Sequence, residues 1–338
     1  MQSSRRNLRI NQDELVVVAV SGQIAHPVGR ANPYRIGYDG IPRVLPGTGG
    51  IVLNKRIGDH CVGLAGDHIE PGVALHNNNR EVIGPRDGPN NALITYACVG
   101  NRVRVITGPA TGATGIVTGK HGGVNHVLVD FPDKILRTLQ IGDRMQIESV
   151  GMGMRLIPHR KIALLNLSPA LLWRWGITES GHAIQVPVTH LIPAGIMGSG
   201  LGKSSAWRGD YDIQLADSRA RKKYRLDSLR FGDLVAITNA DNRRGPLYQK
   251  GFVTVGIIVH GDSTVSGHGP GVTPLMTGPA HCLKVRQDMN ANLAQIFNIR
   301  QPVIPQAQRT FIERDPALHY LNTAASPQLA FNARSYVY

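Results

Sequence analysis

The feature that most constrains the fold is an apolar, β-branched run that ends abruptly in polar residues. Residues 252–259 read FVTVGIIV, a composition typical of a strand buried in a sheet. The run stops at His260-Gly261-Asp262, and the glycine-rich loop GHGPG follows with His268 near its start. A strand delivers its last residues to the sheet edge, and glycines let the loop turn back over them. We therefore expect His260, Asp262 and His268 to lie close together.

Two interpretations of this stretch stay open. Two imidazoles and a carboxylate on a stiff strand end can bind a metal ion or move a proton. Alternatively, Asp262 caps backbone amides in a turn and the histidines hydrogen-bond locally. We favour the functional interpretation, because polar groups concentrated after a buried strand commonly serve a ligand.

Composition indicates a β-rich α+β fold of barrel-like pieces with a few short helices. The chain has 338 residues, of which 42% are hydrophobic, so it can bury substantial cores. Its 39 glycines and 21 prolines favour short strands joined by tight turns. We divide it into a β-rich part (1–95), a small β-barrel module (96–150), an α+β part with the glycine/histidine loop (151–305) and a tail (306–338).

Charge and cysteine content limit the expected binding partners and the expected cellular compartment. The net charge of +14 is compatible with nucleic acid, an anionic substrate or simple solubility. Basic residues are spread, with one dense cluster at 219–223, so nucleic acid is not the expected partner. The three cysteines have no CxxC spacing, which fits a reducing cytoplasm. Neither a signal peptide nor an apolar run of the roughly 20 residues that span a membrane is present in the sequence.

Gly-Asp pairs recur before alternating apolar residues, at Gly58-Asp59, Gly142-Asp143 and Gly232-Asp233. In such a turn, glycine supplies an unusual φ and aspartate accepts backbone hydrogen bonds. These three aspartates are therefore predicted to be structural.

The segment Asp67-His68-Ile69-Glu70 is different, because Pro71 follows it instead of a continuing strand. It places three ligand-type side chains within four residues. We interpret it either as a polar turn or as part of the site. In the second case Asp67 and His68 are metal ligands and Glu70 is the general base.

Two more segments carry candidate substrate contacts. The loop after residues 186–193 resembles half of a phosphate-binding P-loop, but Met197 stands where that motif needs glycine, so no nucleotide cofactor is expected. Backbone amides of this loop can still receive an anionic group or a developing oxyanion; the candidates are Gly198, Ser199 and Gly200.

Asp210 and Asp212 are spaced by two, so they share one face if the segment is a strand. Three interpretations stay open: the two carboxylates bind substrate as a pair, they are further metal ligands, or they lie on the solvated face of an edge strand.

Other segments give the outline of the chain. Residues 15–20 are expected to form a buried strand, and residues 77–95 a polar loop. A helix is predicted to begin at Ser168-Pro169, where serine caps and proline takes the first position. Residues 96–131 alternate strands with glycine turns and resemble the KOW motif, a small SH3-like piece found in ribosomal and elongation proteins. Its loop 119–123 can project toward the main site.

Five stretches together resemble the family known as domain of unknown function 4438. They are GNRVRVITGPATGATGIVTGKHGG, IPAGIMGSGLG, GDYDIQ, LRFGDLVAI and VHGDSTVSGHGPGVTPLMTG, in this order over roughly residues 15–300. This resemblance implies no established activity. The order of GDYDIQ, a Gly-Asp strand and the His260 stretch is also similar to the acetamidase/formamidase family of metal-dependent amide hydrolases. Here His260 precedes the Gly-Asp pair, and the Gln-Gly-Asp-Gly stretch of that family is absent.

The leading hypothesis is a cytoplasmic, homo-oligomeric, metal-dependent hydrolase acting on a small polar substrate such as an amide or cyclic amide. The metal ligands are drawn from Asp67, His68, Asp262 and His268, with His260 and Glu70 as catalytic groups. A zinc-type ion makes hydroxide available near neutral pH. The alternatives are a nucleic-acid-binding protein that uses the KOW-like module and a metal-free protein that binds a small molecule. The shared site requires residues 67–70 and 260–268 to meet in space.

Overall fold

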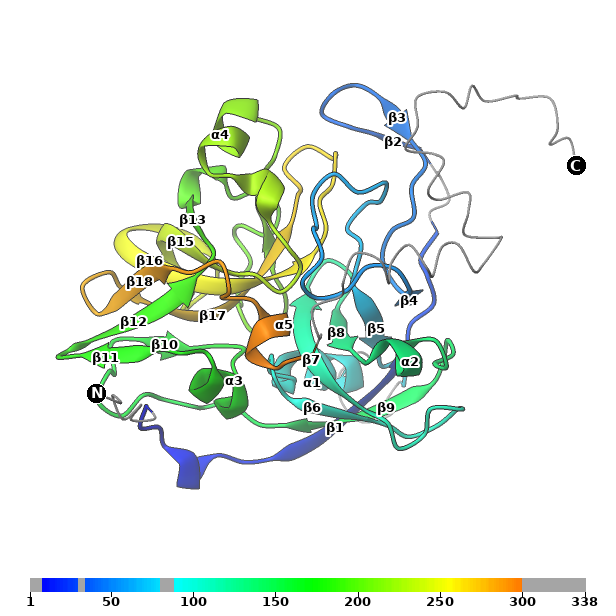
Figure 1. The fold of residues 1–338 in the computed structure, drawn as a ribbon, viewed down its shortest axis with the longest axis horizontal. Coiled ribbons are helices and arrows are strands. Elements are labelled where there is room, and N and C mark those ends of the chain that lie inside the picture. Colours follow the sequence, from blue (N-terminus) through cyan, green and yellow to red (C-terminus); the bar gives the residue numbers. More distant parts are fainter. Residues whose placement is uncertain (1–7, 30–33, 80–87, 300–338) are drawn as a thin grey trace, which may run out of the picture. The chain divides into compact units, whose positions relative to one another are not determined.

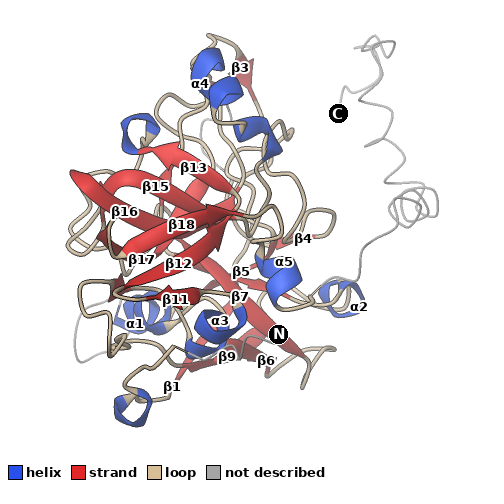
Figure 2. Cartoon of the chain, turned by 60° about the vertical axis from the view of Figure 1, so that its left-hand side comes forward, coloured by secondary structure: helices blue, strands red, loops and turns tan. Residues whose placement is uncertain are grey.

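Strands dominate the structure, a computed structural model that describes residues 8–29, 34–79 and 88–299. The helices are short and lie around the strands (Figures 1 and 2). This arrangement is the β-rich α+β class that the glycine and proline content predicts. Residues 1–299 belong to one compact unit, and the predicted tail, 306–338, lies outside the described residues. Within the described residues, no helix is long and apolar enough to cross a membrane.

Six antiparallel strands from the first half of the chain close into a barrel. Their order is β1-β9-β6-β7-β8-β5, and β5 pairs back onto β1 through Gln23 opposite His76 and Ile24 opposite Leu75. Closure removes the exposed edges that an open sheet has. The strands are β1 (Val18–Ile24), β5 (Gly72–His76), β6 (Arg102–Val105), β7 (Thr114–His121), β8 (His126–Asp130) and β9 (Arg144–Ser149), with β4 (Ile51–Val52) added on β5.

The KOW-like segment 96–131 contributes β6, β7 and β8. In β6, Val103 and Val105 are buried while Arg102 and Arg104 are exposed, as period-two alternation requires. The inward-facing valines fill the barrel core. Strands on both sides of residue 95 share this one barrel.

The second half of the chain forms a six-stranded sheet around the predicted apolar run. Its order is β10-β17-β16-β15-β13, with β14 paired on β17. The run 252–259 lies in the central strand β16 and is buried from residue 253 onward. The strands are β10 (Ala163–Leu164), β13 (His190–Pro193), β14 (Tyr211–Asp212), β15 (Leu234–Asp241), β16 (Leu247–His260) and β17 (Gly271–Pro279).

Strand β7 joins the barrel to this sheet. The hydroxyl of Thr273 donates to the carbonyl of Lys120 at 2.9 Å and accepts from its amide at 3.2 Å. The buried Lys120 ammonium donates to Thr95 O (3.0 Å), Asn166 Oδ1 (2.7 Å) and Trp207 O (2.9 Å). Burial lowers the pKa of Lys120 to about 8. These bonds fix the end of β7 against the second half of the chain.

The remaining elements are small. A three-stranded sheet contains β11 (Thr178–Ser180), β12 (Ala183–Val188) and β18 (Leu283–Gln287), and a hairpin contains β2 (Arg35–Ile36) and β3 (Pro42–Arg43). The helices are α1 (Gly88–Tyr96), α2 (Asp133–Leu136), α3 (Pro169–Arg174), α4 (Ser218–Lys223) and α5 (Leu293–Ile296), with 3-10 turns η1 (Gln12–Glu14), η2 (Ala194–Ile196) and η3 (Leu226–Ser228). Helix α3 begins as predicted, with the Ser168 hydroxyl accepting from the Leu171 amide at 3.2 Å.

The three Gly-Asp turns are confirmed as structural. Each glycine has a positive φ, of 97° at Gly58, 89° at Gly142 and 80° at Gly232. Each following aspartate accepts a hydrogen bond, at 2.9 Å, from the amide three residues before it. The same turn therefore starts three different segments of the fold.

Two local expectations are wrong. The run 15–20 is not a buried strand throughout, because β1 begins at Val18, and Val16 and Val17 are 71% and 64% exposed. The predicted polar loop 77–95 contains α1. The Asn90 side chain accepts from the Asn77 amide and donates to Asn125 O, so this polar residue anchors a helix instead of a loop.

A buried ion pair ties the segment after β4 to the end of β8. Arg56 Nε and Nη2 donate to the two oxygens of Asp130, each at 2.9 Å, and both residues are almost fully buried. Replacing Asp130 with alanine leaves the guanidinium buried without this partner, so we expect a loss of about 3–5 kcal/mol in the free energy of unfolding in urea.

The double variant Arg56→Met/Asp130→Leu should recover much of this loss, because no charge is then left buried. As a control, Glu14→Ala removes an exposed ion pair with Arg155 and should change stability little. Equal unfolding midpoints for Asp130→Ala and wild type would show that the buried Arg56–Asp130 ion pair does not stabilise the fold.

Candidate metal centre

The two predicted stretches meet where the barrel contacts the second sheet. His68 lies in the turn before β5 with a positive φ of 58°, and its amide donates to Asp262 O at 3.0 Å. His260 is the last residue of β16, and His268 lies in the loop that leads to β17. The spatial condition that the sequence analysis set for a shared site is therefore met.

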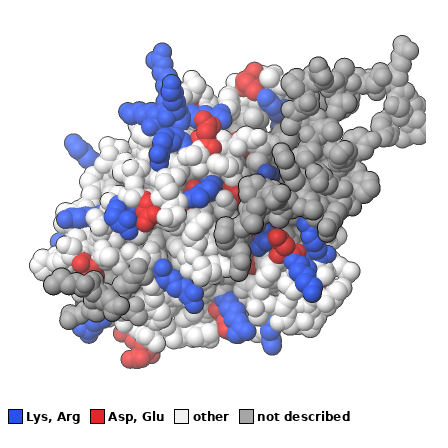
Figure 3. Space-filling model, viewed as in Figure 1, with Lys and Arg blue, Asp and Glu red and all other residues white. Residues whose placement is uncertain are grey.

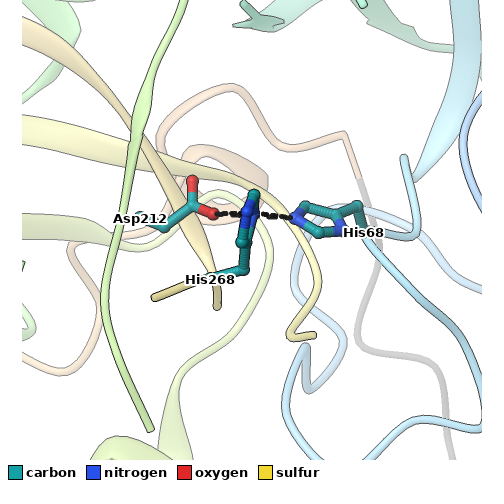
Figure 4. Close-up of side chains that lie close together, drawn as sticks. All are labelled: His68, Asp212 and His268. Carbon is teal, nitrogen blue, oxygen red and sulfur yellow. Dashed lines mark hydrogen bonds and ion pairs between the residues drawn. The ribbon is translucent and has the colours of Figure 1, made fainter. Parts of the chain in front are cut away.

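One group of ligand-type atoms consists of His68, Asp212 and His268. Figure 4 shows the His268 ring between the Asp212 carboxylate and the His68 ring. His68 Nε2 is 3.0 Å from His268 Nδ1 and 3.6 Å from Asp212 Oδ2, and His268 Nδ1 is 3.2 Å from Asp212 Oδ2. Ligand atoms around a tetrahedral zinc ion, with bonds of about 2.0–2.1 Å, stand about 3.3 Å apart. The triangle therefore has the size of one face of such a site.

A second group consists of His121, Asp210 and His260, all buried, with one ligand atom of each within 4.8 Å of the others. His260 Nε2 lies 2.7 Å from Asp210 Oδ2, yet the two atoms lack hydrogen-bond geometry, and both are buried without a hydrogen-bond partner. Buried polar atoms normally have a partner. Two such atoms side by side are expected where both bind the same cation.

Outer contacts orient the imidazoles of His68, His121 and His260. Nδ1 of His68 donates to Asp67 Oδ1 at 2.7 Å, and Nδ1 of His121 donates to Glu70 Oε1 at 2.7 Å. Nδ1 of His260 donates to the carbonyl of Gly261 at 2.9 Å. In each ring Nδ1 is therefore protonated, and Nε2 faces inward. Metal-binding histidines show this carboxylate or carbonyl support.

Glycines make room for the second group. A Cβ atom on Gly271 would lie 2.1 Å from Asp210 Oδ2 and 2.2 Å from His260 Nε2. The amide of Gly122 donates to Asp210 Oδ1 at 2.8 Å, which leaves Oδ2 for the group. A Cβ atom on Gly209 would lie 2.4 Å from the Gly122 Cα, so this approach also requires glycine.

Mutual charge compensation sets the pKa values of the donors. Burial raises the pKa of Asp212, but contacts with His260, His268 and His68 outweigh it and hold this pKa well below the ordinary range. Burial lowers the pKa of His260, but the charge of Asp210 raises it well above the ordinary imidazole value. Burial and the charge of His260 lower the pKa of His121. In the metal-free protein the carboxylates are therefore ionised and His260 carries an extra proton, which a bound cation has to displace.

The outer carboxylates stay ionised. Burial raises the pKa of Asp67, but hydrogen bonds from His68 and Ser263 outweigh it, so the pKa is lowered. Burial likewise raises the pKa of Glu70, but His121 and His126 lower it further than burial raises it.

Several predicted roles change. Glu70, the expected base, is fully buried and accepts from His121, His126 and the Gly49 amide, so it supports a ligand instead. Asp262, an expected ligand, turns away and accepts from the Gly63 amide at 2.7 Å; burial raises its pKa.

The loop 198–200 is also reassigned. Amides of Gly198 and Ser199 donate to Asp212 O and Gly267 O, each at 2.7 Å, so they hold the loop against β14 and are not free for an anionic group. A Cβ atom on Gly200 would lie within 3 Å of Asp210 O and of Tyr211 atoms, so the loop packs closely here.

His121 and His126 are not among the site residues predicted from the sequence. The prediction is only that loop 119–123 can project toward the site, and the structure places His121 and the Gly122 amide there. The sequence pattern that could have indicated His121 is a histidine at the end of a predicted strand, followed by two glycines. Its partners, Glu70 and Asp210, are 51 and 89 residues away, so spacing alone does not reveal them.

A pocket of about 420 Å³ opens onto the donors. His68, His121 and His268 line it, together with Arg35 and Arg43 from the β2–β3 hairpin. Arg35 pairs with Asp67, and Arg43 pairs with Asp39. The pocket gives the donor groups access to a small molecule.

A β-barrel joined to a mixed sheet, with imidazoles and carboxylates buried between them, defines a candidate metalloprotein. Two family models match the chain, described as "Domain of unknown function (DUF4438), N-terminal" over residues 34–173 and "C-terminal" over residues 174–297. The chain belongs to the DUF4438 family. His68 and His121 come from the N-terminal model and Asp210, Asp212, His260 and His268 from the C-terminal one, so the donors need both halves.

A solved structure is similar over most of the chain. It is titled "Crystal structure of TM1086", is 39% identical in sequence, and superposes with a TM-score of 0.80. The match covers 87% of this chain and 99% of that one. No curated protein shows a significant match to this chain.

Metal binding is expected to depend on pH. Contacts with carboxylates raise the pKa values of His68 and His260 above the ordinary imidazole value of about 6.5, so both hold protons in the metal-free protein at and above that pH. Zn²⁺ must displace those protons, and its affinity should therefore rise with pH through and beyond this value. Titration calorimetry in two buffers of different ionisation enthalpy measures the released protons. Constant affinity between about pH 6 and about pH 8 would contradict this.

Proposed function

We propose that this protein is a metal-dependent hydrolase acting on a small polar substrate such as an amide or a cyclic amide. One observation carries the proposal: paired imidazole and carboxylate donors lie beside a pocket of about 420 Å³, and behind them His260 Nε2 and Asp210 Oδ2 are buried 2.7 Å apart without a hydrogen-bond partner. A site with this donor set and room for a small molecule fits hydrolysis better than a structural role.

The donors suit a zinc-type ion, which lowers the pKa of bound water to about 7 and so supplies hydroxide at neutral pH. His260 is fully buried, so its role is that of a ligand rather than an acid or base. The side chain of His268 is 33% exposed and lines the pocket, so a metal ion bound to it is within reach of a substrate.

The arginines of the pocket replace the loop 198–200 as donors to the substrate. Arg35 and Arg43 bring guanidinium groups to the same wall as His68 and His268. Guanidinium groups bind carbonyl and carboxylate oxygens through well-directed hydrogen bonds. A polar substrate with an oxygen facing the hairpin fits this wall.

His68→Ala and His268→Ala are expected to lower the zinc content of protein reconstituted with Zn²⁺ at limiting free ion, measured by plasma mass spectrometry. Each removes one donor from a three-donor group. The same variants should lower the rate of amide or cyclic-amide hydrolysis at least tenfold, measured as carboxylate release from a substrate panel, since loss of ligand support typically costs 10- to 100-fold.

Asp262→Asn is the matched control. Asp262 lies two residues from His260, but its carboxylate accepts from the Gly63 amide, and asparagine can still accept that hydrogen bond. It should keep wild-type zinc content and activity. Zinc-free wild-type protein after reconstitution, or variants that hydrolyse at the wild-type rate, would refute the proposal.

Nucleic-acid binding is the competing function, and the basic helix α4 is the feature that favours it. Figure 3 shows its basic side chains gathered, while other basic groups on this face stand apart among acidic ones. Arg221 of α4 pairs with Asp227 in the following turn η3. A continuous basic face would produce affinity that falls steeply with salt, and we expect no such binding.

We also propose that the protein is a homo-oligomer. Ile36, Ile41 and Val44 on and beside the β2–β3 hairpin are 69%, 52% and 62% exposed. Exposed apolar side chains close together are typical of an interaction surface. Light scattering on the purified protein measures its mass directly, and a mass of one chain would refute this.

A further inference from the structure

The carboxylate of Asp212 faces both donor groups, each with a different oxygen. Its Oδ2 lies 3.2 Å from His268 Nδ1 and 3.6 Å from His68 Nε2. Its Oδ1 lies 3.6 Å from His260 Nε2, which belongs to the other group. A carboxylate placed between two donor groups in this way has the arrangement of a bridging ligand.

The two groups are in contact with each other. The His68 ring centroid is 5.0 Å from that of His260 in the other group, the same separation as from His268 in its own. The His68 and His121 centroids, which also belong to different groups, are 5.8 Å apart. Paired ions in two-metal sites stand about 3.5–4 Å apart, which this spacing accommodates.

Carboxylates gather around the two groups. Asp210 and Asp212 lie among the donors, and Asp67 and Glu70 support His68 and His121 from outside. Asp67 also pairs with Arg35, which leaves three negative charges that divalent ions can offset. Burying carboxylates so close together without compensating positive charge is costly.

The donors are nitrogen and carboxylate oxygen, and the three cysteines of the chain are not among them. Imidazole with carboxylate suits zinc, manganese, iron and related ions better than soft ions that prefer thiolate.

We propose that the centre holds two divalent ions, one at His68, Asp212 and His268 and the other at His121, Asp210 and His260, bridged by the two carboxylate oxygens of Asp212. This deepens the proposed function by specifying the number of metal ions and the ligand that bridges them. It rests on metal binding at this site but not on the hydrolysis.

The test begins with the full-length chain, stripped of metal and reconstituted with Zn²⁺. Plasma mass spectrometry should find two zinc ions per chain in the wild type. His268→Ala and His121→Ala should each retain one, because each variant damages one group only. Asp262→Asn should retain two, and far-UV circular dichroism of each variant checks that it is folded.

Reconstitution with Mn²⁺ gives a readout on the wild type alone, which does not depend on a variant folding. Electron paramagnetic resonance should show the multiline spectrum of an exchange-coupled pair, and His121→Ala should show the six-line spectrum of isolated Mn²⁺. One ion per chain with uncoupled Mn²⁺ would overturn the two-ion centre and leave a one-metal hydrolase standing. Absence of bound metal under all conditions would overturn both.

Discussion

Burying Asp210 and Asp212 next to each other is the constraint on which the rest of the site depends. Two carboxylates taken from water into one small volume repel each other, and they stay ionised only where positive charge surrounds them. The structure provides this with the imidazoles of His68 and His260, whose pKa values are raised. The imidazoles of His68 and His121 are in turn oriented by Asp67 and Glu70, so this outer layer follows from the inner one.

The fold brings these charged side chains together because several strands end at the same place. The end of β7 in the closed barrel, the short strand β14 and the end of the central strand β16 all deliver donors to one point. The hydrogen bonds of buried Lys120 and of Thr273 hold β7 in position against the second sheet. Donors on strand ends stay close to a fixed geometry, which a metal site needs more than a flexible surface site does.

Sequence patterns foretold the parts of the structure that depend on neighbouring residues. The buried run 252–259, the three Gly-Asp turns and the capped start of α3 are confirmed, because composition, φ preference and capping are local properties. Of the pair Asp210 and Asp212, only Asp212 lies in a strand, β14, and Asp210 comes directly before it. The role of Glu70 was not predictable, because its partners His121 and His126 are 51 and 56 residues away. Barrel closure between β1 and β5 and the turning away of Asp262 are likewise set by contacts between distant segments.

The central claim is that the buried donors bind divalent metal, and anomalous diffraction from crystals grown with Zn²⁺ tests it most directly. Data collected above and below the zinc absorption edge locate the ion without reference to activity. The account predicts an anomalous peak within about 2.0–2.2 Å of His260 Nε2 and Asp210 Oδ2. A flat map at these atoms, in crystals that show zinc elsewhere, would contradict it.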